Sequence, residues 1–231
     1  MWNNYFFQIQ KKYNIRVSTK EPLVIRFDGK GITRNKDINF LDDYKGSFSN
    51  CLEETAKYFT EKYNESYCLF GSDEISFIFL KPMDVIVDLD PSDNSTYSNE
   101  IIALFSQYFF NYFNMLNEHY KIFWHGKCFS IKENKLTSYL KYRMGIIKNV
   151  MATYFLKKKS LKMGNHKLDV KISKCKEFDD YDKLEKLIEG TLYYSGKKID
   201  LKEFVNSGNI VEIVSKEDEA AQNFSLDLVE F

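Results

Sequence analysis

The sequence contains few of the residues that interrupt or cross-link a chain. Three prolines and ten glycines among 231 residues exclude a collagen-like or linker-rich protein and disfavour an all-β chain with many turns. The four cysteines lie far apart, with no CxxC pair and no histidine at zinc-ligand spacing, so we expect buried, reduced thiols and no zinc site. Long helices packed on a modest sheet fit this composition best.

Net charge and long apolar segments are also absent. Lys+Arg and Asp+Glu number 33 each, so any attraction to nucleic acid or to a membrane must come from a local patch. No basic-then-apolar leader opens the chain, and no uncharged run approaches the ~20 residues that a membrane span requires. We therefore expect a soluble cytoplasmic protein without membrane contact. What is present, 44% hydrophobic residues including many aromatics, is ample for a packed core.

The hydrophobic pattern predicts strands and helices in alternation. Apolar runs bounded by glycine or acidic turns indicate strands, and apolar steps of three and four indicate helices. The expected strands lie at about 22–27, 67–70, 75–80 and 122–131, and the expected helices at about 41–63, 98–119 and 138–158. The polar segment 84–99 is expected to be a loop with a short edge strand at 84–87.

This order of elements (β, α, β-hairpin, α, β) is a split βαβ pattern. The expected fold class is therefore α+β, with a ferredoxin-like palm of the kind found in polymerases and nucleotide cyclases over residues 1–137. Residues 138–231 are expected to form a helical or mixed C-terminal region, with a helical appendage after about 177. The strong basic patch, eight lysines within 157–176, is a candidate for contacts with RNA phosphates.

Two acidic turns carry the candidate chemistry. Asp28 ends the first strand, and Asp73 and Glu74 lie in the hairpin turn. In a split βαβ sheet the first strand lies beside this hairpin, so Asp28 and Asp73 should meet at one edge of the sheet. Two carboxylates that share a site repel each other unless a cation separates them, and Mg²⁺ binds such oxygens together with substrate phosphates. A pair of ions would stabilise both the attacking and the leaving oxygen of a phosphoryl or nucleotidyl displacement.

A glycine-punctuated turn, Gly29 to Arg34, follows the first aspartate. Free backbone N–H groups in such a turn can bind an anion, and the side chains of Lys30 and Arg34 add positive charge. A triphosphate fits this description. Either turn alone is most often an ordinary turn, and it is their combination in this strand order that favours a site.

Three segments resemble motifs of the tRNA-His guanylyltransferase family. They are Ile25–Arg34, Phe70–Phe77 and Tyr139–Asn149. In the third segment Met144 and Lys148 stand where the family carries Gln and Arg. The resemblance covers about two-thirds of the chain.

Two departures refine this resemblance. The His-Ile-Asn-Asn motif of the eukaryotic branch is absent, and His125 stands where many relatives carry an acid. The sequence is therefore more similar to the prokaryote-type "like" proteins, which repair 5′-truncated tRNAs by templated addition.

The resemblance implies a 3′–5′ polymerase that adds nucleotides to the 5′ end of tRNA or tRNA-like RNA, with GTP and ATP as substrates. It implies two Mg²⁺ ions held by Asp28, Asp73 and the carbonyl of Gly29, with Glu74 as a supporting catalytic residue. The residues implied to bind the incoming triphosphate are Asp28, Gly29, Lys30, Gly31, Ile32, Thr33, Ser72 and Asp73. The candidate contacts to RNA or triphosphate are Arg143, Asn149, Lys157, Lys158 and Lys159. Because family members often form dimers or tetramers, we expect a homo-oligomer.

Two alternatives stay open. The same palm with paired aspartates serves nucleotide cyclases and makers of cyclic oligonucleotides, in which a 3′-hydroxyl attacks an α-phosphate without an RNA acceptor. A non-catalytic RNA-binding relative is the other alternative, and the altered third motif is its only hint in the sequence. The intact Asp28 and Asp73 argue against it.

Overall fold

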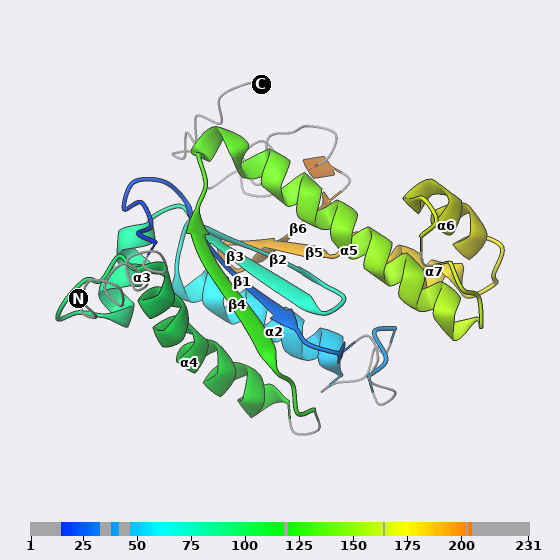
Figure 1. Ribbon diagram of the computed structural model, residues 1–231, viewed down its shortest axis with the longest axis horizontal. Helices are drawn as coiled ribbons and strands as arrows, with labels where there is room; N and C mark the ends of the chain where they lie inside the picture. Colours follow the sequence, from blue (N-terminus) through cyan, green and yellow to red (C-terminus); the bar gives the residue numbers. More distant parts are fainter. Residues whose placement is uncertain are drawn as a thin grey trace, which may run out of the picture.

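A six-stranded antiparallel sheet forms the centre of the computed structural model, which describes residues 15–32, 38–41, 47–117, 120–163, 165–201 and 203–204 (Figure 1). Within these residues the strand order is β4-β1-β3-β2-β5-β6, and every neighbouring pair is antiparallel. The strands are β1 (Leu23–Gly29), β2 (Ser66–Gly71), β3 (Glu74–Phe79), β4 (Trp124–Ser130), β5 (Thr191–Tyr194) and β6 (Lys197–Ile199).

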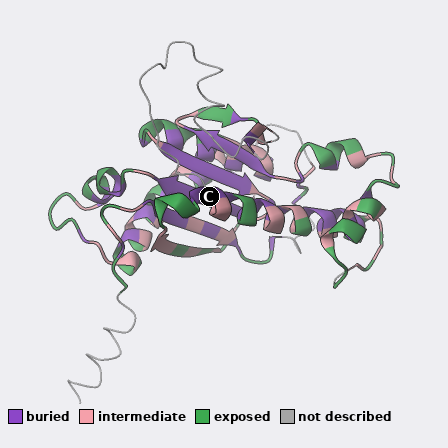
Figure 2. Cartoon of the chain, turned by 90° about the horizontal axis from the view of Figure 1, so that it is seen from above, coloured by how far each residue is buried: buried purple, intermediate pink, exposed green. Residues whose placement is uncertain are grey.

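Helices cover the two faces of this sheet unequally. Helices α2 (Phe48–Lys62) and α4 (Ser98–Leu116) pack side by side on one face, and the long helix α5 (Leu136–Lys158) crosses the other (Figure 1). Shorter helices complete the described fold, namely α3 (Pro82–Leu89), the 3₁₀ turn η2 (Glu133–Lys135), α6 (Leu168–Cys175) and α7 (Tyr181–Glu185). Figure 2 shows that the central strands are buried, whereas exposed residues gather on the surrounding helices and loops.

Aromatic side chains fill the layer between the sheet and helices α2 and α4. Phe27 of β1 stacks on Phe109 of α4 with ring centroids 4.3 Å apart, and Phe59 of α2 meets Phe77 of β3 at 5.3 Å. All four rings are fully buried. Because successive strand residues point to opposite faces, Arg26, Asp28, Glu74 and Ser76 must then lie on the face turned towards α5.

The long elements agree with the sequence analysis, since the four predicted strands and three predicted helices are all present with shifted ends. The prediction of an edge strand at 84–87 is wrong, because these residues belong to helix α3. Pro82 occupies the first turn of that helix, where its missing N–H group costs nothing. Val85, Ile86 and Leu89 then bury one helical face.

The expectation of a helical appendage after 177 is only partly met, since β5 and β6 extend the sheet. β5 pairs with β2, and β6 pairs with β5. Ser195 and Gly196 join these strands with φ of 45° and 81°, the left-handed geometry of a tight hairpin turn. The boundary between a palm-like domain over 1–137 and a region over 138–231 stays a prediction, and strand pairing crosses it. Residues 205–231 lie outside the described part of the chain.

Cys51, Cys68 and Cys175 are buried, as expected, whereas Cys128 is only partly buried. Burial raises the pKa of Cys51 to about 11, so this thiol stays protonated and unreactive at neutral pH. In the described residues, no helix combines the length and the apolar character that crossing a membrane would take.

Candidate functional site

The two predicted acidic turns meet at one end of the sheet. In the pairing of β1 with β3, Asp28 lies opposite Glu74, and the N–H of Gly29 donates to the carbonyl oxygen of Asp73 at 2.7 Å. Burial raises the pKa of Asp73, and the nearby charge of Asp28 acts in the same direction. The structure thus brings Asp28 and Asp73 together as the strand order predicts, whereas their roles as metal ligands stay a prediction.

Tight backbone packing holds this end of the sheet together. A Cβ atom at Gly29 would lie 1.9 Å from Cδ1 of Ile32 and 3.3 Å from the carbonyl oxygen of Asp73, so a larger residue would displace the side chain of Ile32 and crowd the turn at Asp73. Ser72 adopts a left-handed φ of 50°, and its hydroxyl donates to Oδ1 of Asp73 at 3.0 Å. The side chain of Asp73 is therefore oriented by its own turn.

The predicted anion-binding turn after Asp28 differs in part from expectation. The N–H of Gly29 donates to Asp73, and that of Lys30 donates to the carbonyl oxygen of Phe123 at 2.7 Å. These two N–H groups are therefore not free to bind a phosphate. The exposed side chain of Lys30 and the turn at Gly31, with φ of 79°, remain as candidate contacts. Thr33 and Arg34 lie outside the described residues.

Glu74 forms a buried ion pair with Arg143 of α5. Nε of Arg143 donates to one carboxylate oxygen at 2.9 Å, and a terminal nitrogen of the guanidinium donates to the other. The two residues are only 4% and 5% exposed. Burial raises the pKa of Glu74, while Arg143 acts against this shift. Glu74 is thus bonded through both oxygens, which fits a supporting residue better than a metal ligand.

This ion pair also gives Arg143 a partner that the sequence analysis missed. The two residues are 69 positions apart, so no helical or strand spacing links them. Because the guanidinium points into the protein, its predicted contact with RNA or triphosphate would require the ion pair to open. That contact stays a prediction.

The donor atoms at this site are hard oxygens. Within the described residues no group of three or more His, Cys, Asp or Glu is arranged to hold a metal ion. Asp28 and Asp73, with the carbonyl of Gly29, supply a smaller set. Mg²⁺ commonly binds through one or two carboxylates together with waters and substrate phosphates, so these residues fit that ion.

The other predicted RNA contacts lie on α5 or directly after it, and three of them have partners within the protein. Asn149 accepts a hydrogen bond from Lys171, which is itself only 2% exposed. Lys158 donates to Asn39, and Lys159 pairs with Asp180 at 2.7 Å. Lys157 is exposed at the end of α5. Their contact with RNA stays a prediction.

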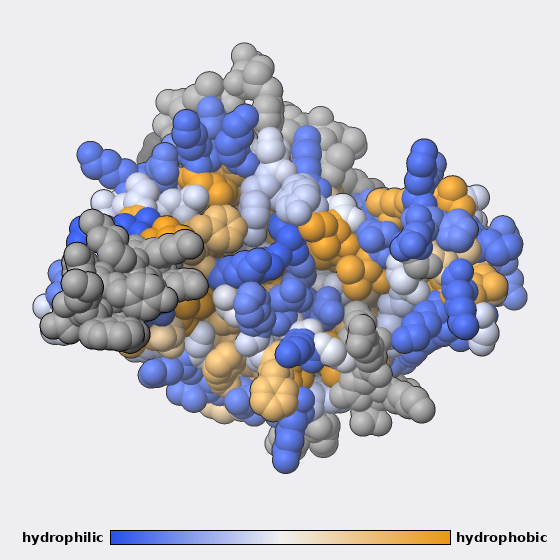
Figure 3. Space-filling view, viewed as in Figure 1, coloured by the Kyte–Doolittle hydropathy of each residue, from blue (hydrophilic) through white to orange (hydrophobic). Residues whose placement is uncertain are grey.

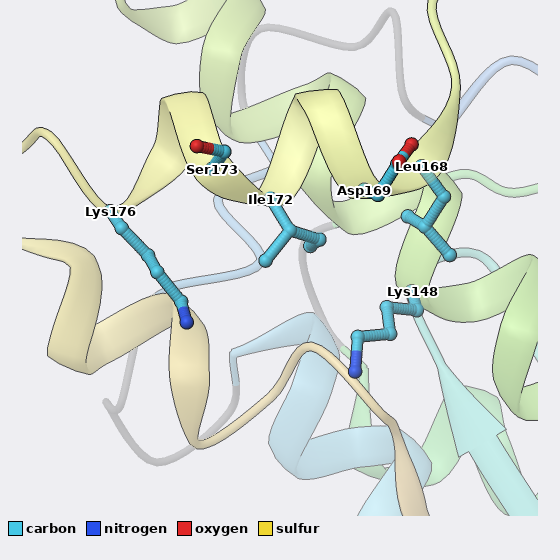
Figure 4. A pocket seen from close by; sticks show the side chains of 6 residues that line it. All are labelled: Lys148, Leu168, Asp169, Ile172, Ser173 and Lys176. Carbon is cyan, nitrogen blue, oxygen red and sulfur yellow. The ribbon is translucent and has the colours of Figure 1, made fainter.

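Part of the basic patch borders an open cavity of about 630 Å³ between α5 and α6. Its lining residues are Lys148, Leu168, Asp169, Ile172, Ser173 and Lys176. The amino groups of Lys148 and Lys176 extend into the space below Ile172, and Lys148 also pairs with Glu189 at 2.8 Å (Figure 4). The cavity is thus basic at its ends and apolar between them.

Comparison with known proteins places the fold. No protein-family model matches the sequence, and neither does any curated protein. Among solved structures, a bacterial tRNA-His guanylyltransferase-like protein in complex with GTP superposes with a TM-score of 0.56 and 14% identity over 82% of both chains. The same kind of bacterial protein in complex with ATP gives 0.54 and 13%, over 82% of this chain and 83% of the other.

The tRNA-His guanylyltransferase from Saccharomyces cerevisiae is similar as well. Its TM-score is 0.56, with 16% identity over 84% of this chain and 93% of the yeast chain. The protein described here therefore has the fold of tRNA-His guanylyltransferase-like proteins. The resemblance indicated by its motifs is confirmed at the level of the fold.

Proposed function

We propose that this protein is a Mg²⁺-dependent nucleotidyltransferase that adds nucleotides to the 5′ end of tRNA or tRNA-like RNA, on a ferredoxin-like palm. The observation that carries the proposal is the meeting of Asp28 and Asp73 at one end of the sheet. Two further facts support it, namely the shared fold and the GTP and ATP bound in the bacterial structures.

The residues divide into three groups by their proposed roles. Asp28, Asp73 and the carbonyl of Gly29 hold two Mg²⁺ ions, which when bound stabilise charge on the attacking and leaving oxygens of an in-line displacement at phosphorus. The triphosphate contacts are Lys30, Gly31, Ile32, Thr33 and Ser72. Asn149 and Lys157 to Lys159 are proposed to contact RNA.

Glu74 and Arg143 act by positioning. Glu74 directly follows Asp73, and its ion pair fastens the β2–β3 turn to α5. Ser72 orients the carboxylate of Asp73 from the other side through its hydroxyl. These contacts hold the carboxylates ready before metal and triphosphate arrive, which is the preorganisation that electrostatic catalysis needs. We further expect a cytoplasmic dimer or tetramer.

The test uses the full chain with Mg²⁺, a 5′-truncated tRNA and either GTP or ATP labelled at the α-phosphate. Label that moves onto the RNA and depends on Mg²⁺ supports the proposal. A small cyclic product formed without RNA would instead identify a nucleotide cyclase or cyclic-oligonucleotide synthase. Absence of both products, with RNA still bound, would identify a non-catalytic RNA-binding protein.

A further inference from the structure

Two cations lie side by side on the sheet face that carries Asp28. Arg26 of β1 is directly opposite Lys127 of β4, and Asp28 is directly opposite His125 in the same ladder. Directly opposed residues of an antiparallel pair have their Cβ atoms about 4.5–5.5 Å apart and point to the same face. Arg26 and Lys127 are thus immediate neighbours, one step along the strands from Asp28.

Both cations lack an acidic partner. No hydrogen bond or ion pair within the described residues involves either side chain, and Nε of Arg26 is buried without an acceptor. The hydroxyl groups of Ser76, directly opposite Arg26 on β3, and of Tyr139 on α5 are also buried without a hydrogen-bond partner. Buried donors normally have an acceptor. These donors therefore indicate that an acceptor from a bound ligand occupies this position.

The ion pair between Glu74 and Arg143 explains why Arg26 has no acidic partner. Burial raises the pKa of Glu74, and Arg26 is close enough for its charge to oppose that rise, but both carboxylate oxygens of Glu74 are already bonded to Arg143. Arg26 makes no ion pair with Asp28 either. Like charges directly opposite each other in a sheet are destabilising, so the Arg26–Lys127 pair carries a cost that a bound anion would remove.

The surroundings of this pair fit the end of an RNA chain. Hydrophilic side chains gather at the centre of the face shown in Figure 3, where strands β4 and β1 lie between α4 and α5 in Figure 1. Tyr142 on α5 is 62% exposed and lies beside Arg143, 5.6 Å from ring centre to guanidinium. An exposed aromatic ring beside a guanidinium is typical of sites that stack an unpaired base.

We propose that Arg26 and Lys127 bind the 5′-phosphate of the RNA acceptor beside Asp28. The inference rests on the proposed function and extends it to the second reactant. The triphosphate is assigned to the turns after Gly29 and at Ser72, at the end of β1. Arg26 and Lys127 lie further back along the strands, so the two phosphate groups would approach Asp28 from different sides. This arrangement suits attack of a 5′-phosphate oxygen on the α-phosphorus of the triphosphate, which forms one P–O bond and breaks another as pyrophosphate leaves.

The test compares two versions of a short single-stranded RNA labelled at its 3′ end, one with a 5′-phosphate and one with a 5′-hydroxyl. Fluorescence anisotropy measures the affinity of each for the wild type, Arg26→Met and Lys127→Met. We expect the wild type to prefer the 5′-phosphate by about tenfold, the size of one hydrogen bond to a charged group. Either variant should lose this preference while keeping its affinity for the 5′-hydroxyl RNA and for GTP.

Lys57→Met is the matched control, because Lys57 is exposed on α2, across the sheet from the site. It should keep the preference. If Arg26→Met does not fold by circular dichroism, Lys127→Met decides alone, because Lys127 is exposed. A wild type without preference, variants that keep it, or variants that instead lose affinity for GTP would each overturn the inference.

The label-transfer assay on the wild type separates this inference from the proposed function. If label moves onto RNA and both variants still prefer the 5′-phosphate, this inference is overturned and the proposed function stands. Absence of both label transfer and Mg²⁺-dependent GTP binding overturns the proposed function, and this inference with it.

Discussion

The two faces of the sheet are built from different kinds of side chain. The face under α2 and α4 is aromatic and buried, with Phe27 stacked on Phe109 and Phe59 packed against Phe77. The face under α5 carries Asp28, Arg26 and the Glu74–Arg143 ion pair, with buried donors that lack partners. Proteins usually break local packing rules where they bind or react, which supports the proposal that the site lies on the α5 face and that the aromatic face stabilises the fold beneath it.

The largest effect should follow from removing either aspartate on the α5 face. Asp28→Ala or Asp73→Ala should lower label transfer by a factor on the order of 10³ or more, because metal-ion stabilisation of the transition state is worth several kcal/mol. The midpoint temperature of thermal unfolding should change little, since removing either carboxylate relieves the repulsion between the two. The matched control is Asp84→Ala, at an exposed acidic residue on α3. Full activity of the double variant would refute the assignment.

A substitution on the aromatic face should show the opposite pattern. Phe109→Ala should lower the free energy of unfolding by about 3–5 kcal/mol, because it removes the ring that stacks on Phe27 and leaves a cavity in its place. The same helix provides a control in Met115→Ala, whose side chain is 72% exposed, with an expected change within about 0.5 kcal/mol. Urea denaturation measures the free energy of unfolding of both variants. Binding of GTP by the folded fraction should be unchanged, and a selective loss of GTP affinity would contradict the division between the faces.

The buried ion pair offers a more selective test of the α5 face. Arg143→Met should destabilise the protein by about 3 kcal/mol, because it leaves the carboxylate of Glu74 buried without a partner. Combining it with Glu74→Gln should restore most of that stability, since neither charge then remains. Positioning by the pair predicts that the Mn²⁺ affinity falls equally in Arg143→Met and Glu74→Gln, without further loss in the double variant.

A direct contact between Arg143 and the triphosphate would give a different result. Arg143→Met would then weaken GTP binding whether or not Glu74 was replaced, and Glu74→Gln alone would leave GTP binding intact. Unchanged Mn²⁺ affinity in all variants would limit the pair to a structural role. Lys62→Met, at an exposed ion pair between α2 and α3, is the control.

The sequence was sufficient for the parts of the fold that depend on local pattern. The helical spacing of Phe105, Phe109 and Phe113 predicts α4, and these three rings are buried as that spacing requires. Helix α3 was missed because its acidic residues and short length resemble a loop. The β5–β6 hairpin was missed because its stability comes from pairing with β2, which is more than 120 residues away in sequence.

The same distinction holds for the site. The meeting of Asp28 and Asp73 could be predicted, because it follows from strand order alone. The pairing of Glu74 with Arg143 could not, because it depends on where α5 crosses the sheet. The opposition of Arg26 and Lys127 depends on a strand register that a shift of one residue would abolish.

The smallest effect should come from the ion pair on the aromatic side, between Lys62 and Asp88. Its atoms are 2.8 Å apart, but both side chains are partly exposed, so solvent screens the attraction. Burial acts to raise the pKa of Asp88, yet hydrogen bonds from Lys62 and Tyr63 lower it below its ordinary value of 3.8. A carboxylate with a lowered pKa stabilises the fold above that ordinary value, and the contribution disappears as the pH falls through the folded-state pKa.

Asp88→Asn should therefore reduce stability by a small, constant amount at neutral pH, and the difference from the wild type should vanish in acid. Lys62→Met should cost about 0.5 kcal/mol, and this loss should shrink at high salt. Denaturation curves across pH and ionic strength measure both. A loss as large as that of Arg143→Met would mean that burial does not separate the two ion pairs, and the contrast between the faces would then rest on their aromatic packing alone.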